Sequence, residues 1–188
     1  QTNIPGLYAI GECDYQYHGA NRLGANSLLS CIFTGLFIGP GLKKLLGSLK
    51  ESASDAKFDS LMRGAQSEKQ QEHLKLLGRA GGNENPYLIH QELGDVMTRV
   101  ATVVRHNDQL AAGYEKVREL EERAKHCSLS DTGQWTNQNV VYTKALRDMF
   151  PIAKAILKGA QARDECRGAH YKPAFEMPGL TADDPSER

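Results

Sequence analysis

The residues with the clearest potential for chemistry lie in one stretch near the start of the chain, HGANRLGANSLL, which spans His18–Leu29. Its glycines allow a backbone to approach a flat ligand closely. Arg22 supplies a planar guanidinium that can hold a carboxylate through two parallel hydrogen bonds. A salt bridge to a surface neighbour is the alternative role for Arg22, and the residue types alone leave both interpretations open.

Two further groups near this stretch favour a ligand site. A helix is predicted to begin near Asn26 and Ser27, because both side chains can accept the free N–H groups of a first turn. Its N-terminus, at Ser27 and Leu28, carries partial positive charge that attracts an electronegative group. Glu12 follows a predicted buried strand over residues 7–10, where its carboxylate can accept hydrogen bonds from two hydroxyls, such as those of a ribose or ribitol.

The elements that must position these groups are predicted to be the end of an α/β domain, made of that strand and a buried helix over residues 27–39. The helix is apolar nearly all round, which is typical of an interior helix. Gly35 and Gly39 indicate a neighbour packed close to its backbone, and Pro40 is expected to end or bend it.

The rest of the chain is predicted to be helical, so the fold class is mainly α. Residues 47–85 are polar and contain the glycine-rich stretch GRAGGNENP, which favours a loosely attached helix followed by a linker. The predicted domains are therefore 1–46, 47–85 and 86–188. The polar tail from Lys172 onward is expected to wrap over a surface.

Residues 86–188 are predicted to contain an antiparallel three-helix bundle, with helices that begin after Asn85, after Asn107–Asp108 and at about Asn137. Pro151 lies inside the third helix and is expected to kink it. The apolar positions expected to face inward are Ile89, Leu93, Val96, Met97, Val100 and Val104 in the first helix, Leu110, Tyr114, Val117 and Leu120 in the second, and Val141, Ala145, Leu146, Met149, Ile152, Ala153, Ile156, Leu157 and Ala160 in the third.

Composition excludes several kinds of partner. The chain has 23 basic and 23 acidic residues, so no net charge favours nucleic acid or an acidic membrane surface.

The four cysteines of the chain lie far apart, which favours free thiols in a reducing cytoplasm over a metal site or a disulfide framework. The histidines do not have metal-ligand spacing either. The apolar stretch 28–38 is too short to cross a bilayer, and no signal peptide is expected before it.

Two segments resemble the flavoprotein subunits of succinate dehydrogenase and fumarate reductase. Residues 18–29 match the segment of that family that lies beside the flavin, and an acidic residue precedes it in both. The segment ARDECRGAHY, residues 162–171, is similar to the family's C-terminal motif, with Cys166 in place of the usual serine. On composition alone, the RGAH part of this segment is expected to cap a helix or dock the helices on another domain.

The resemblance implies FAD as cofactor and gives roles to four residues. Glu12 occupies the position of an acidic residue that binds the ribitol or ribose hydroxyls of FAD. Ser27 and Leu28 occupy the positions at which a helix N-terminus meets the isoalloxazine ring. Arg22 occupies the position of an arginine that binds a carboxylate of succinate or fumarate. The strand and buried helix would then be the end of an FAD-binding domain.

The resemblance also implies a reaction and an assembly. In this family hydride passes between the dicarboxylate and FAD, and electrons pass to or from quinone through an iron–sulfur subunit and a cytochrome b membrane anchor. The tail and the TNQ before the third helix resemble the subclass that works with menaquinone and a dihaem cytochrome anchor. Membership of the family implies a peripheral position on the cytoplasmic side of the membrane. The family's G-x-G-x-x-G fingerprint and proton-delivering arginine do not occur here, so no catalytic residue is expected. The chain is interpreted as a truncated piece that is inactive alone.

Two rival interpretations remain at this stage. L-aspartate oxidases share HGANR and a helical C-terminal domain, although RLGANSLLS favours the succinate and fumarate enzymes. A non-catalytic helical interaction module that keeps a relic of the flavin segment is the second alternative.

Overall fold

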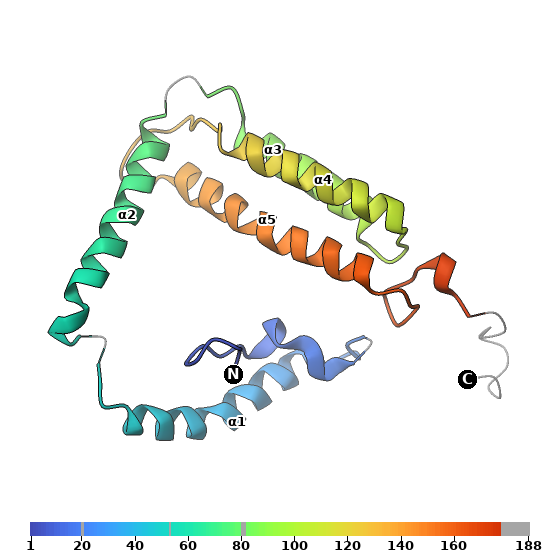
Figure 1. The fold of residues 1–188 in the computed structure, drawn as a ribbon, viewed down its shortest axis with the longest axis horizontal. Coiled ribbons are helices and arrows are strands. Elements are labelled where there is room, and N and C mark those ends of the chain that lie inside the picture. The colour runs from blue at the N-terminus through green and yellow to red at the C-terminus, as the bar shows by residue number, and fades with distance from the viewer. Residues whose placement is uncertain (20, 53, 80–81, 178–188) are drawn as a thin grey trace. The chain divides into compact units, whose positions relative to one another are not determined.

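The computed structural model describes residues 1–19, 21–52, 54–79 and 82–177. The elements are the 3₁₀ turns η1 (Gly11–Cys13), η2 (Tyr15–His18), η3 (Ala56–Phe58) and η4 (Pro173–Phe175), and the helices α1 (Asn26–Ser48), α2 (Asp59–Leu77), α3 (Pro86–Val100), α4 (Asn107–Ala124) and α5 (Gln138–Ala162) (Figure 1). Contacts divide the chain into two compact units, Gln1–Met62 and Arg63–Arg188. The prediction of a mainly helical chain is confirmed.

The strand predicted over residues 7–10 is wrong. Ile10 has extended backbone angles, with φ −140° and ψ 160°, but no described residue pairs with this segment. A strand requires a neighbouring strand to complete its ladder of hydrogen bonds. The described residues form only isolated bridges, and none of these lies near residues 7–10. The segment is therefore extended without being part of a sheet.

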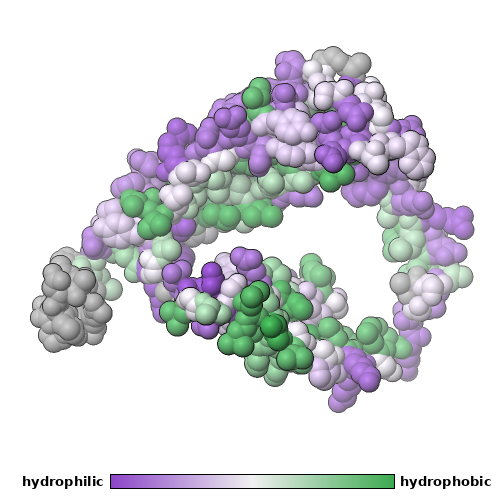
Figure 2. All heavy atoms as spheres, turned by 180° about the vertical axis from the view of Figure 1, so that it is seen from behind, coloured by the Kyte–Doolittle hydropathy of each residue, from purple (hydrophilic) through white to green (hydrophobic). Residues whose placement is uncertain are grey.

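The helix predicted over residues 27–39 is longer and more exposed than expected. Helix α1 runs from Asn26 to Ser48, so Pro40 does not end it, and none of its residues is buried. No described atom outside the helix lies within 4 Å of a Cβ built on Gly35 or Gly39. Burial was inferred from composition, but composition indicates only that a helix needs a neighbour. Among the described residues the η1 turn packs on this helix, and it leaves every α1 residue at least partly exposed. Figure 2 shows the hydrophobic side chains that α1 exposes.

Because α1 is longer than predicted, its length has to be compared again with the thickness of a bilayer. The helix has 23 residues, with a mean hydropathy of 1.3 in its most apolar window, so length and composition would allow it to cross a membrane. The expectation that the apolar stretch is too short is therefore wrong. Core helices and leader segments near an N-terminus have the same length and composition, so this property alone is weak evidence for a membrane span.

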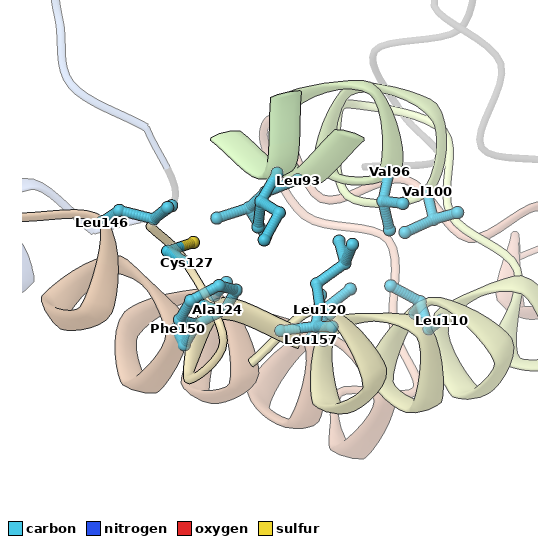
Figure 3. Close-up of a cluster of buried hydrophobic side chains, with 14 residues drawn as sticks. Leu93, Val96, Val100, Leu110, Leu120, Ala124, Cys127, Leu146, Phe150 and Leu157 are labelled. Atoms are coloured by element: carbon cyan, nitrogen blue, oxygen red, sulfur yellow. The ribbon is translucent and has the colours of Figure 1, made fainter. Parts of the chain in front are cut away.

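Helices α3, α4 and α5 share one hydrophobic core, drawn in Figure 3. Asn85 caps α3 by accepting the Tyr87 N–H, and Asn137 caps α5 by accepting the Val140 N–H, as predicted. Helix α4 instead has His106 at its N-cap position, without a side-chain cap bond. The buried side chains converge from the three helices: Ile89, Leu93, Val96, Val100, Leu110, Val117, Leu120, Ala124, Leu146, Phe150, Ala153, Leu157 and Ala160.

Five of the positions expected to face inward on α5 are exposed: Val141, Ala145, Met149, Ile152 and Ile156. At 3.6 residues per turn they form a second stripe, about a third of a turn away from the buried face. The apolar pattern of this helix therefore covers two faces, and only one of them packs on α3 and α4. The helix continues through Pro151. In the first helix, Val104 is also exposed, because α3 ends before it.

Among the described residues, helix α2 packs on others only near its C-terminal end, which agrees with a loosely attached polar helix. Leu76 and Leu77 form a small second core with Leu129 and Val140, whereas residues 59–71 are exposed. A loosely packed helix of this kind depends on its last turn for its position.

Residues 82–85 of the linker are tied to α4. Arg123 donates to both carboxylate oxygens of Glu84, at 2.8 and 3.1 Å, and to those of Glu92 on α3, at 2.8 and 2.9 Å. A Cβ at Gly82 would lie 2.6 Å from the carbonyl oxygen of His126, so only glycine fits there. These contacts set the direction in which the chain enters α3.

Candidate functional site

The first predicted site residue, Glu12, lies in the η1 turn. The preceding residue, Gly11, has φ +74°, a left-handed conformation that favours glycine. The Glu12 side chain is exposed and forms no ion pair with any described residue. Its carboxylate is therefore free to accept hydrogen bonds from a ligand.

The second group, the N-terminus of α1, differs in detail from the expectation. The N-cap residue is Ala25, with φ 64°, and no side chain caps the helix, so the predicted capping by Asn26 or Ser27 is wrong. The N–H groups of a first turn have no partner within the helix and need an outside acceptor. Ser27 is half-buried and Leu28 is 76% exposed. An uncapped, accessible helix N-terminus is suited to an electronegative ligand edge.

The third group, Arg22, lies in the loop between η2 and α1. Its guanidinium makes one weak contact, 3.5 Å from Nη1 to the carbonyl oxygen of Leu23, and no ion pair with a described residue. The side chain is exposed. The planar guanidinium can therefore bind a carboxylate that does not belong to the described residues.

The structure connects the elements that carry two of these groups. The η1 turn packs on α1, which places the turn that carries Glu12 against the helix whose N-terminus is at Ser27 and Leu28. No contact links Arg22 to either group among the described residues. A carboxylate, a close-approach glycine and an uncapped helix end fit the hydroxyls and the electronegative ring edge of a dinucleotide flavin. No group of three or more potential metal ligands occurs in the described ranges.

Segments near both ends of the chain match known protein families. Residues 90–185 match the family described as fumarate reductase flavoprotein C-terminal, and residues 1–28 match an FAD-binding domain. The chain belongs to the succinate dehydrogenase and fumarate reductase flavoprotein family. FAD is the cofactor that this membership indicates, and the match over residues 1–28 includes the whole candidate site.

Individual relatives agree with the family. The chain is 47% identical over 174 residues to the succinate dehydrogenase flavoprotein subunit of Bacillus subtilis, covering 93% of this chain and 29% of the relative. It is 32% identical over 176 residues to the fumarate reductase flavoprotein subunit of Escherichia coli, covering 92% of this chain and 28% of the relative. The chain therefore spans under a third of the length of these flavoproteins.

Solved structures give the same assignment. The Mycobacterium smegmatis Sdh1 complex in the apo form matches with a TM-score of 0.81 and 26% identity, over 92% of this chain and 28% of that chain. An E. coli quinol fumarate reductase matches with a TM-score of 0.76 and 31% identity, over 96% of this chain and 29% of that chain. The helical architecture is thus shared with flavoproteins of this family.

The family's C-terminal motif forms a buried polar cluster in this flavoprotein. The Nε2 atom of His170 lies 2.8 Å from the carbonyl oxygen of Arg163, the C-cap residue of α5, and Lys172 Nζ donates to the carbonyl of Gln161. Both contacts cap the end of α5, as expected for this segment. Lys172 is 1% exposed, and its Nζ also donates to Asp164. Sequence reasoning missed Lys172, because an isolated lysine gives no sign of burial.

The neutral form of His170 is fixed by its partners. Arg105 Nη1 lies 2.6 Å from His170 Nδ1, and a guanidinium can only donate, so Nδ1 accepts and Nε2–H donates to the Arg163 carbonyl. Burial lowers the pKa of His170, although its bond to the Arg163 carbonyl opposes this, and the charges of Arg105, Arg163 and Lys172 lower it further. Protonation would place a proton against the Arg105 guanidinium.

This arrangement predicts a pH-dependent stability. A histidine whose folded pKa lies below its unfolded value of about 6.5 contributes fully above that pH, and its contribution falls as the pH drops below it. We expect the urea midpoint of the flavoprotein chain to fall between pH 7 and pH 5, and to fall less in His170→Gln, whose amide keeps a donor and an acceptor. Paired carboxylates such as Glu84 and Glu92 lose their contribution only below about pH 4.5. Equal slopes in both chains from pH 7 to pH 5 would contradict this role.

Proposed function

We propose that this chain is the C-terminal part of a flavoprotein subunit that interconverts succinate and fumarate by hydride transfer to or from FAD. One observation carries the proposal. The segment that matches the FAD-binding family contains Arg22, whose guanidinium forms no ion pair with a described carboxylate. Arg22 lies four residues before the start of a helix that no side chain caps. A guanidinium that can bind a carboxylate, close in sequence to a helix end that can meet a flavin, suits a dicarboxylate oxidoreductase.

The chain's own residues would hold the cofactor at two places. Glu12 accepts hydrogen bonds from ribitol or ribose hydroxyls, and the N–H groups at Ser27 and Leu28 meet the isoalloxazine ring. Bound FAD supplies the two-electron, hydride-transferring chemistry. Support comes from the η1 turn packing on α1 and from the family match over residues 1–28.

Arg22 is proposed to bind one carboxylate of succinate or fumarate. A bidentate contact fixes both the distance and the rotation of the dicarboxylate, and orientation of this kind contributes much of an enzyme's rate. The catalytic groups that move protons are proposed to lie outside this chain, because it spans under a third of its relatives' length. The 188 residues alone are therefore expected to be inactive.

The proposed partners follow the assemblies of the relatives. Matching structures are described as Sdh1 in complex with UQ1 and as quinol–fumarate reductase with menaquinol molecules. We propose that electrons pass between FAD and quinone, menaquinone in this case, through an iron–sulfur subunit and a cytochrome b anchor. The flavoprotein would then be peripheral, on the cytoplasmic side of the membrane. Helix α1 would belong to the FAD-binding domain, because the FAD-binding match includes its first turn.

A spectroscopic experiment on the full-length flavoprotein tests the proposal. We expect the purified protein to carry one FAD whose absorption near 450 nm is bleached by succinate without oxygen and restored by fumarate. Bleaching by L-aspartate and not by succinate would replace the proposal with an L-aspartate oxidase. A full-length protein that binds no FAD would leave a non-catalytic helical module.

A further inference from the structure

Gly11 occupies an unusual position in the first unit. Among the described residues of 1–62 it is the only buried one, and it lies where the η1 turn meets α1. Every other described residue of this unit is at least partly exposed. The packing of η1 on α1 is therefore concentrated at one glycine, directly before the proposed FAD ligand Glu12.

Thr34 on α1 holds the amide of Gly11. The Thr34 hydroxyl donates its proton to the carbonyl oxygen of Ser30, at 2.9 Å, so its lone pairs are available to accept the Gly11 N–H, at 3.3 Å. Both hydrogen-bonding roles of this hydroxyl are used within the chain. The Thr34 hydroxyl therefore acts on the turn: its proton is held by α1, and one of its two lone pairs accepts the Gly11 N–H.

Two other side chains hold the same glycine. The Tyr17 hydroxyl donates to the Gly11 carbonyl oxygen at 3.2 Å. A Cβ added to Gly11 would lie 3.4 Å from Cys31 Sγ, so the turn approaches α1 closely at this point. We call Thr34, Tyr17 and Cys31 together the Gly11 clasp.

The Gly11 clasp connects the turn that carries Glu12 to the helix whose N-terminus is the other proposed FAD-binding group. Ser27, Cys31 and Thr34 are separated by four and three residues, which places them on one face of α1. Gly11 packs on that face at Cys31 and Thr34, and Ser27 begins the same face two turns earlier. The clasp thus sets where the carboxylate after Gly11 lies relative to the helix N-terminus.

We propose that Thr34 and Tyr17 are positioning residues for FAD, which hold Glu12 in register with the N-terminus of α1. This inference rests on the proposed function, in which both groups contact one rigid cofactor. A ligand that must meet two fixed groups binds more tightly when their separation is set before it arrives. Without the clasp, part of the binding free energy would be spent on ordering the turn.

Replacing Thr34 in the full-length flavoprotein tests the inference. Thr34→Val keeps the shape but leaves the buried Gly11 N–H without an acceptor, and we expect about a tenfold weaker FAD affinity. Tyr17→Phe should weaken it in the same direction. Thr34→Ser restores the hydroxyl and should bind within about twofold of the parent. Affinity is measured by quenching of flavin fluorescence on titration of FAD into the apoprotein, and the visible circular dichroism of bound flavin reports its surroundings.

Two control variants make the outcome decisive. Ser48→Ala removes a hydroxyl that donates to a backbone carbonyl of the same helix, far from Gly11, and should change nothing. Glu12→Gln tests the ligand itself: unchanged FAD affinity in that variant overturns the proposed role of Glu12. Weakened binding in Glu12→Gln with parental binding in Thr34→Val overturns the clasp. Weaker binding in Thr34→Val that Thr34→Ser fails to restore, with a lower melting temperature of the apoprotein, also overturns it in favour of general destabilisation.

Discussion

Arg22→Lys in the full-length flavoprotein is expected to retain FAD and to lose at least about 100-fold in kcat/KM for succinate. Lysine keeps the positive charge but replaces a planar pair of donors with a single ammonium group. A dicarboxylate held by one point of contact can rotate, so a smaller fraction of bound substrate is oriented for hydride transfer. Steady-state kinetics with an artificial electron acceptor, together with the flavin absorption of each protein, measures both effects.

A matched variant separates this effect from the general loss of an arginine. Arg99→Lys changes an exposed arginine on α3, outside the candidate site, and should leave kcat/KM within about twofold. Near-parental succinate oxidation by Arg22→Lys would remove Arg22 from the substrate site. Loss of flavin from that variant would assign it to the cofactor instead.

The residues of the candidate site could be singled out from the sequence because they lie close together along the chain, and their roles at the site stay a prediction. Arg22, Glu12 and the start of α1 lie within about twenty residues, and their side-chain types indicate an anion and a hydroxyl-bearing cofactor without any tertiary information. The details of the helix start were not predictable in the same way. Ala25 takes a left-handed conformation that no residue preference favours, so the helix begins uncapped although good capping residues follow.

The helices were predictable wherever a periodic apolar stripe has its partner within the chain. Leu93 on α3 and Leu120 on α4 were expected inside and are buried. Two of the errors concern segments whose apolar surface the described residues leave largely uncovered. Residues 7–10 have the pattern of a strand and find no strand beside them, and α1 has the composition of a buried helix but is exposed. A sequence pattern states that an apolar surface needs a partner, and it does not state where that partner lies.

Phe150→Ala is expected to cost about 3–5 kcal/mol in the free energy of unfolding of the 188-residue chain. Phe150 is 1% exposed and lies in the core between α3, α4 and α5, beside Cys127 and Ala124 in Figure 3. Truncation removes its burial and leaves a cavity that rigid neighbouring helices fill only in part. Urea unfolding followed by circular dichroism at 222 nm measures the change, because residues 1–62 bury only Gly11 among those described and contribute little cooperative stability.

Ile152, two residues further along α5, provides the control. It is 61% exposed on the second apolar stripe, so Ile152→Ala should change the stability of the same chain by no more than about 0.5 kcal/mol. The sequence pattern predicted that Ile152 faces inward and did not single out Phe150, so by that prediction truncation of Ile152 would be the costly change. A large loss in Phe150→Ala beside a small loss in Ile152→Ala would establish that α5 stabilises this unit through one face only. Comparable losses in both variants would show that the second stripe is buried in solution, which contradicts the arrangement described here.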